Sequence, residues 1–237
     1  YKLYDHSSLN LSFLCGYRIF DIFADDMYVL PFWDKVLYDE IEKLSDNYFF
    51  LSATSIQPHT QSASTILANY GDSIETFQED KLLKEYMNYK INDWMGATIP
   101  PNIVHRDIWD LVGGYSIEYS PGMYSDPDFT AKLYMCGVRF MKGLQASRIY
   151  HFETKSTTRI RKNCGQMQFL LKWGMTSSTF RKVFTYKGKD FKSQKIGTFK
   201  TGNRFKISLI RGRLKAIFYL LTKDFGPLWK FWKKTFV

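Results

Sequence analysis

The stretch YRIFDIFADDMYVLPFWDKVL, residues 17–37, decides how the fold is interpreted. Its apolar segment Ile19–Ala24 has the length and composition of a β-strand. This strand ends on two adjacent carboxylates, Asp25 and Asp26, which repel each other. Residues 19–34 contain no Lys or Arg. We therefore expect a positive partner from outside this segment to neutralise the pair.

The composition indicates a globular protein, because 45% of its 237 residues are hydrophobic and 18% are aromatic. The cysteines Cys15, Cys136 and Cys164 lie far apart, so their spacing indicates neither a zinc site nor a disulfide framework. We interpret them as reduced thiols of a cytoplasmic protein. The longest apolar run near the C-terminus, Ala216–Leu221, is far shorter than the roughly 20 residues of a membrane-spanning helix.

The charge is distributed unevenly along the chain, which has 33 basic and 23 acidic side chains in all. Residues 151–237 contain 21 of the basic side chains but only three of the acidic ones. The first 150 residues therefore hold 12 basic and 20 acidic side chains. We expect the two parts of the chain to face different partners.

Helices and strands are expected to alternate, which favours an α/β fold over an all-helical one. Asp34 and Asp126, the latter followed by Pro127, are predicted N-caps, and residues 54–71 are predicted to form a long polar loop. The remaining pattern predicts helices over residues 35–44, 73–93, 105–112, 127–137, 166–184 and 205–222, and strands over residues 47–53, 138–142 and 147–152.

Two carboxylates at the end of a strand suit a hard divalent cation such as Mg²⁺ or Mn²⁺, which takes oxygen ligands. Such an ion, arriving with the phosphates of a nucleotide, would neutralise Asp25 and Asp26. The same pair also suits a solvated turn that binds nothing. Its position at the end of a strand leaves both interpretations open.

Three segments in order, ADDMYVLPFWD (24–34), HRDIWDLVGGYSIEYSPGMYSDPDF (105–129) and IYHF (149–152), resemble the family 2 glycosyltransferases. The resemblance covers about residues 7–163. It implies a partial GT-A fold, which is Rossmann-like with a mixed sheet and flanking helices, over residues 1–163. Residues 164–237 would be a helical basic extension.

The resemblance also implies a metal and donor site. Asp26 would be the direct ligand of Mg²⁺ or Mn²⁺, Asp25 would contact the metal or the donor ribose, and His151 would be a third metal ligand. Many relatives carry an acid or Asn where this chain has Ala24, so the motif is shorter than usual. Taken alone, His151 is more typical of a hydrogen-bonded structural histidine.

Arg159 and Arg161 follow the last predicted strand. The resemblance implies that they belong to a flap that closes over the donor phosphates. The alternative interpretation is a solvated basic loop that binds no ligand.

On the acceptor side, the resemblance makes Asp126 the general base, because a carboxylate must take the proton of the attacking hydroxyl. Asp128 and Gly114 would contact the acceptor, and the reaction would invert the anomeric carbon. Ser125 replaces the usual Glu of the motif. The alternative for Asp126 is a helix cap, and we expect the positive end of that helix to lower its pKa.

The basic C-terminal part has an apolar stripe among cations. Such a helix suits the surface of an anionic membrane, but the stripe could equally pack on the catalytic core. Nucleic acid is a weaker interpretation, since no recognised binding motif accompanies the charge. The stripe consists of Phe205, Leu209, Ile210, Leu214, Ile217, Phe218 and Leu221, and aromatic residues and lysines follow in residues 226–237.

These features predict a metal-dependent, inverting transfer of sugar from a nucleotide-sugar donor to a saccharide or lipid-linked acceptor, at the cytoplasmic face of a membrane. Because the family's opening strands and base-binding loop would precede Tyr1, we expect an N-terminally truncated chain that binds nucleotide weakly and is inactive alone. The alternative is a catalytically inactive relative whose basic tail binds a membrane or a partner. Ala24 and Ser125 support that alternative.

Overall fold

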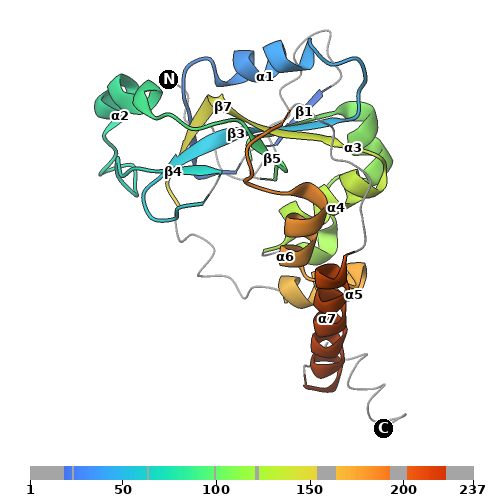
Figure 1. Cartoon of the computed structure of the whole chain (residues 1–237). Coiled ribbons are helices and arrows are strands. Elements are labelled where there is room, and N and C mark those ends of the chain that lie inside the picture. The colour runs from blue at the N-terminus through green and yellow to red at the C-terminus, as the bar shows by residue number, and fades with distance from the viewer. Residues whose placement is uncertain are drawn as a thin grey trace.

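The computed structural model describes residues 19–22, 24–62, 64–98, 100–120, 123–153, 164–192 and 202–222. Within these residues the chain is an α/β protein whose strands form one seven-stranded mixed sheet (Figure 1). Helices pack on both faces of this sheet, which confirms the predicted α/β class and a mixed sheet with flanking helices. The arrangement is compatible with a Rossmann-like fold.

The strands are arranged in the order β1-β6-β3-β7-β2, with β4 beside β3 and β5 beside β7. The two central strands, β3 and β7, run parallel, whereas β6 is antiparallel to β3 and β2 is antiparallel to β7. The strands span Ile19–Ile22 (β1), Met27–Val29 (β2), Phe49–Gln57 (β3), Thr65–Leu67 (β4), Trp94–Met95 (β5), Asn102–His105 (β6) and Phe140–His151 (β7).

Every residue of β3 is buried, because helices cover both faces of the sheet. Successive side chains of β3 point to opposite faces. Phe50 lies in the cluster that includes Phe129 of α4, while Phe49 and Leu51 lie in the cluster that includes Leu37 of α1. The helices are α1 (Trp33–Ile41), α2 (Glu79–Glu85), α3 (Arg106–Val112), α4 (Ser125–Met135), α5 (Gly165–Trp173), α6 (Ser177–Phe180) and α7 (Asn203–Thr222).

The predicted N-caps of α1 and α4 were wrong. The residues that precede these helices are Phe32 and Tyr124, whose φ angles of 65° and 85° lie in the left-handed region. Asp34 and Asp126 are the second residues of their helices and therefore lie in the first turn. The carboxylate of Asp126 is consequently available for a contact other than capping.

Several predicted boundaries also change. Residues 54–71 are not one loop, because β3 continues to Gln57 and β4 pairs with it in parallel. The predicted helix over residues 73–93 is only α2 and a 3₁₀ turn, Tyr86–Asn88. The two predicted strands over residues 138–152 form the single strand β7, and β6 was not predicted at all.

Residues 165–192 share the core of the α/β body, although the sequence assigned them to the extension. Phe169 and Phe180 lie in the same cluster as Phe129 of α4. The following backbone also joins the sheet, where the amide of Met95 donates to the carbonyl of Lys189 at 2.8 Å. The predicted helix over residues 166–184 is divided at Gly174 into α5, α6 and a π-helical turn, Arg181–Thr185.

Helix α7 projects from the body beyond α5 (Figure 1). Two residues of this helix are buried: Phe205 packs against the body, and Gly212 lies beside Leu170 of α5. Among the described residues, no helix is long and apolar enough to cross a membrane.

Candidate active site

Two parallel strands end at the same edge of the sheet, and polar side chains collect there. Gln57 is the last residue of β3 and His151 is the last residue of β7. Ligands of open α/β sheets bind outside the carboxyl ends of strands, so this edge is the first place to look for a site. We use the name edge cluster for Asp26, Gln57, His151 and Glu153.

Asp26 reaches this edge because β2, which follows it, pairs with the end of β7. Met27 is the register partner of His151, and the amide of Phe152 donates to the carbonyl of Asp26 at 3.0 Å. The acidic pair follows β1, as the sequence predicted, and occupies the turn that leads to β2. Asp25 is exposed, whereas Asp26 is partly buried.

Asp26 and His151 face each other, although 125 residues separate them in the chain. His151 Nε2 lies 3.2 Å from Asp26 Oδ2. Two ligands that bind one ion at roughly 2.1 Å, at right angles, lie about 3 Å apart. The observed separation therefore suits either a hydrogen bond between the ring and the carboxylate or two ligands of a shared metal ion.

Gln57 lies beside the ring nitrogen of His151 that faces away from Asp26. The amide nitrogen of Gln57 donates to the carbonyl of Thr60 at 2.6 Å and lies 3.3 Å from Glu153 Oε1, so its amide oxygen points the other way. That oxygen accepts from Ser55 and lies 3.4 Å from His151 Nδ1. Both ring nitrogens therefore face oxygens that can only accept, Gln57 Oε1 and the carboxylate of Asp26, and the tautomer decides which of them the ring N–H meets.

The same geometry suits two states of the ring. With its proton on Nε2, His151 would donate to Asp26. With a metal ion at Nε2, the ring proton would lie on Nδ1 and face Gln57, and histidine ligands of metals commonly donate their other ring N–H to a neighbouring oxygen in this way. Gln57 is therefore placed to orient His151 if Nε2 binds a metal ion.

Glu153 fixes the loop after β3 and was not predicted from the sequence. Its backbone is left-handed, with φ 53°, and its Oε2 accepts from the amides of His59 and Thr60 at 2.8 and 3.0 Å. Burial would raise the pKa of Glu153, but hydrogen bonds from Thr60 and His59 and the nearby His151 outweigh it and lower the pKa. The carboxylate is therefore held in its charged form.

The edge cluster supplies few metal ligands. Among the described residues, no group of three or more His, Cys, Asp or Glu side chains is positioned to hold a metal ion. Asp26 and His151 provide two ligands, so phosphate oxygens and waters would have to complete the shell of Mg²⁺ or Mn²⁺. The predicted donor-binding residues Arg159 and Arg161 lie outside the described residues.

A second group of side chains surrounds Asp126 at the start of α4. The hydroxyl of Tyr115 donates to Asp126 Oδ1 at 3.0 Å. Lys187 lies near enough for its charge to act on the same carboxylate. We use the name helix cluster for Asp126, Tyr115 and Lys187.

Burial raises the pKa of Asp126, whereas the hydrogen bond from Tyr115 and the charge of Lys187 act in the opposite direction. The expectation that the helix end would lower this pKa was therefore wrong. Burial also raises the pKa of Tyr115, and the neighbouring Asp126 adds to the effect. Burial, with a smaller effect from Arg181, lowers the pKa of Lys187 to about 8.

Lys187 reaches the helix cluster because its backbone is held against β5. Its amide donates to the carbonyl of Arg181 at 3.1 Å, and the next amide, that of Gly188, donates to Met95 at 3.0 Å. Gly96 permits this approach, since a Cβ there would lie 2.8 Å from the Cα of Lys187. Lys187 was not predicted, because its role depends on chain segments that are 60 or more residues apart.

Asp128 is completely buried and holds α4 against α5. Its carboxylate accepts from Ser116 Oγ at 2.7 Å and from Trp173 Nε1 at 2.8 Å, and Lys172 Nζ lies 3.0 Å from its Oδ1. An acceptor sugar would have to displace one of these groups to reach Asp128. Its predicted acceptor contact stays a prediction.

Gly114 lies against the ring of Trp109 of α3 and has a packing role. Its φ is +57°, and a Cβ would lie 2.7 Å from the ring of Trp109. Its carbonyl accepts from Lys132. The predicted acceptor contact of Gly114 also stays a prediction.

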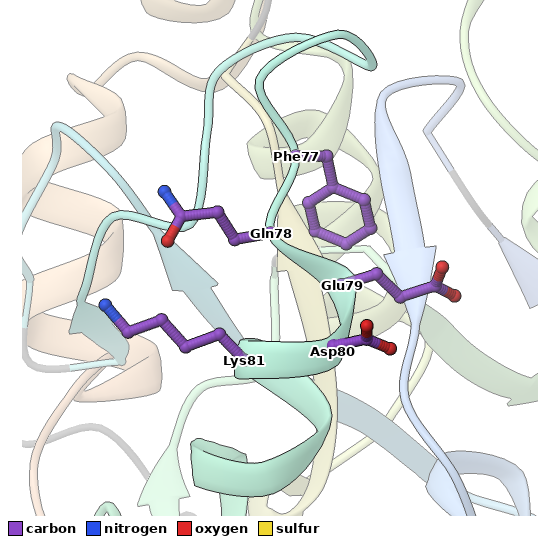
Figure 2. Close-up of a pocket in the computed structure, with 5 residues that line it drawn as sticks. All are labelled: Phe77, Gln78, Glu79, Asp80 and Lys81. Carbon is purple, nitrogen blue, oxygen red and sulfur yellow. The ribbon is translucent and has the colours of Figure 1, made fainter.

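A surface pocket of about 340 Å³ lies at the start of α2 and is lined by residues 77–81 (Figure 2). None of the predicted site residues lines it. The hydroxyl of Tyr28, two residues after Asp26, donates to Glu79 Oε1 at 2.5 Å and connects the pocket to β2. The edge cluster and the helix cluster contain the predicted residues Asp26, His151 and Asp126, so we consider these two clusters, and not the pocket, as the candidate site.

Comparison of the chain with models of known protein families gave no match, and comparison with curated proteins gave no significant match. The resemblance to family 2 glycosyltransferases therefore stays a prediction that rests on the residues described above.

Proposed function

We propose that the protein is an inverting, metal-dependent glycosyltransferase that uses a nucleotide-sugar donor and a GT-A fold. The observation that carries the proposal is the contact between Asp26 and His151 at the carboxyl ends of β3 and β7. The resemblance to family 2 glycosyltransferases implies that both residues belong to one metal site. Two side chains 125 residues apart meet there at a distance that suits a shared ion.

On the donor side, Asp26 and His151 would hold Mg²⁺ or Mn²⁺ together with the diphosphate of the donor. A bound divalent cation stabilises the negative charge of a departing nucleoside diphosphate. With the ion at Nε2, Gln57 would accept the hydrogen bond from His151 Nδ1, and Glu153 keeps the loop after β3 in place. With only two protein ligands, the ion should bind weakly until the diphosphate arrives.

On the acceptor side, Asp126 would accept the proton of the attacking hydroxyl. As the new bond from the acceptor oxygen to the anomeric carbon forms, the bond to the donor phosphate breaks and its electron pair leaves with the nucleoside diphosphate. The raised pKa of Asp126 makes it a better base than an ordinary aspartate. Tyr115 orients the carboxylate, and attack from the side opposite the leaving group inverts the anomeric carbon.

The test uses the purified protein with any natural residues that precede Tyr1 or follow Val237. Binding of Mn²⁺ is measured by titration with and without each nucleoside diphosphate, and a panel of nucleotide sugars is tested for release of the nucleoside diphosphate. We expect one diphosphate to increase Mn²⁺ affinity and its sugar nucleotide to be consumed. Asp110→Asn is the matched control for substitutions of Asp26 and Asp126, because Asp110 is an exposed aspartate of α3.

The second candidate is a catalytically inactive relative that binds a membrane or a partner. Ala24 and Ser125 favour it, as does the small ligand set of the edge cluster. This candidate predicts no consumption of any nucleotide sugar and no change in Mn²⁺ binding when a diphosphate is added. The titration and the panel therefore separate the two functions.

A further inference from the structure

In the part of the chain that the structure describes, the α/β body covers one side of helix α7. The ring of Phe205 packs against Phe184 at a centroid distance of 5.7 Å, and Gly212 lies beside Leu170 of α5. Leu209, which lies between them, and Ala216, one turn after Gly212, are on the same side and are partly buried. This side anchors the helix to the α/β body.

The opposite side of α7 exposes a continuous apolar stripe. Its six large side chains are between 50% and 68% exposed. They recur at intervals of three and four residues, which places them on one face of the helix. Five of the six belong to the stripe predicted from the sequence, and their exposure shows that the body does not cover them, whereas Phe205 of the predicted stripe packs on the body as the alternative predicted. The exposed stripe consists of Ile207, Ile210, Leu214, Ile217, Phe218 and Leu221.

Cations line both borders of the stripe. At about 100° per residue, Arg204 and Arg211 fall on one border, whereas Lys206 and Arg213 fall on the other. All four residues are exposed. Residues 203–222 contain no Asp or Glu. The exposed side of α7 is therefore an apolar centre between two rows of positive charge.

We propose that α7 lies in the headgroup plane of an anionic lipid bilayer. The apolar stripe would enter the boundary between headgroups and acyl chains, and the two rows of cations would meet lipid phosphates. A helix of 20 residues would lie along about 30 Å of this surface. The proposal does not depend on the enzymatic activity proposed above.

The charge pattern favours lipid over the other possible occupants. A second copy of α7 packed on the stripe would bring cations against cations, with no acidic side chain from either helix to pair with them. A nucleic acid would pair with the cations but would leave the apolar centre exposed. An anionic membrane satisfies both parts of the surface at once.

Co-sedimentation of the full protein with phosphatidylcholine vesicles, with and without phosphatidylglycerol, tests this proposal. Wild type should sediment with the anionic vesicles. The variant L214S/F218S should lower the partition coefficient at least about 10-fold, because two large apolar side chains leave the stripe. The control I74S/M135S replaces two comparably exposed apolar side chains elsewhere on the body and should sediment like wild type.

A second variant, R211E/R213E, changes one cation on each border and leaves the stripe intact. It should also weaken binding about 10-fold or more, as should a rise in salt concentration. Circular dichroism checks that both variants remain folded. The proposal is overturned if either variant binds anionic vesicles like wild type, or if wild type binds neutral and anionic vesicles equally. It is also overturned if L214S/F218S abolishes a dimer or an oligonucleotide complex instead.

Discussion

The edge cluster and the helix cluster each centre on a partly buried aspartate, yet their partners differ. Asp26 faces Nε2 of His151, whose other ring nitrogen faces Gln57. Asp126 instead accepts a hydrogen bond from Tyr115 in surroundings that raise its pKa. The comparison shows that the two carboxylates have different neighbours, and in the proposed function one would bind a cation and the other would accept a proton.

The largest effect is expected from a substitution that disrupts the helix cluster. Asp126→Asn removes the base but keeps the shape of the side chain, so turnover should fall by about 100-fold to 10,000-fold. Donor binding should be unchanged, because the edge cluster is intact. Single-turnover transfer with saturating donor measures the first quantity, and titration with the nucleoside diphosphate and Mn²⁺ measures the second.

Asp110→Asn provides the control for this experiment and should retain wild-type turnover. If Asp126→Asn transfers sugar at the wild-type rate, the helix cluster has no role as a base, and the division between the two clusters is lost.

The next largest effect is expected from substitutions that disrupt the edge cluster. Asp26→Asn and His151→Gln should each weaken Mn²⁺ binding at least about 10-fold in the presence of the diphosphate, since each removes one of two protein ligands. Asp25→Asn should have a smaller effect, because Asp25 is exposed. Calorimetric titration compares the three variants. Equal losses in all three would indicate a general effect of negative charge instead of a defined ligand pair.

A smaller effect on Mn²⁺ affinity is expected from a substitution of Gln57. Gln57→Leu keeps much of the side-chain volume but removes the acceptor for His151 Nδ1, so the ring is free to place its proton on Nε2. Mn²⁺ affinity should fall about 10-fold, as is usual when the orienting partner of a ligand is lost. Unchanged affinity would show that the tautomer is not set by Gln57.

The smallest effect concerns pH. Transfer should fail as the pH falls through the raised pKa of Asp126, because the base is then protonated. Tyr115 and Lys187 both lower this pKa, so Tyr115→Phe and Lys187→Met should each move the acid limb of the rate profile to higher pH. A shift to lower pH in either variant contradicts the assigned contacts.

The same raised pKa affects stability. A carboxyl group whose pKa is higher in the folded state stabilises the fold below its unfolded pKa and loses this contribution as the pH rises through the folded value. Asp126→Asn removes the titration. The unfolding free energy of this variant, relative to wild type, should therefore increase as the pH rises from the ordinary pKa of an aspartate, about 4, through the raised pKa of Asp126. Urea unfolding at several pH values measures the difference.

Short-range sequence patterns correctly predicted one strand and the ends of two helices. The apolar run before Asp25 predicted β1, and the Gly residues at 113 and 137 marked the ends of α3 and α4. The sequence also predicted that the acidic pair follows a strand. Each of these features depends on neighbours within a few residues.

Other features depend on contacts between distant segments. The last residues of β3 are mostly polar and were predicted to form a loop. Thr54 can nevertheless be buried, because its hydroxyl donates to the carbonyl of Leu144 at 2.9 Å. The helix starts were predicted at Asp34 and Asp126, whereas Phe32 and Tyr124 adopt the left-handed conformation that side chains of this size rarely take.

The candidate site shows the same division. Asp26, His151 and Asp126 were predicted with the help of a family resemblance. Gln57 and Lys187 could not be, because neither residue stands in a motif. Gln57 acquires its role only when β3 and β7 lie in parallel, and Lys187 only when the segment after α6 returns to β5.

The most direct test of the edge cluster is electron spin resonance of Mn²⁺ bound to the protein with a nucleoside diphosphate, read for coupling to a ligand nitrogen. We predict a ¹⁴N coupling from His151 that disappears in His151→Gln, while Mn²⁺ remains bound through the diphosphate and Asp26. A spectrum without nitrogen coupling in the wild type, or a coupling that persists in His151→Gln, would contradict the assignment of a cation to Asp26 and His151.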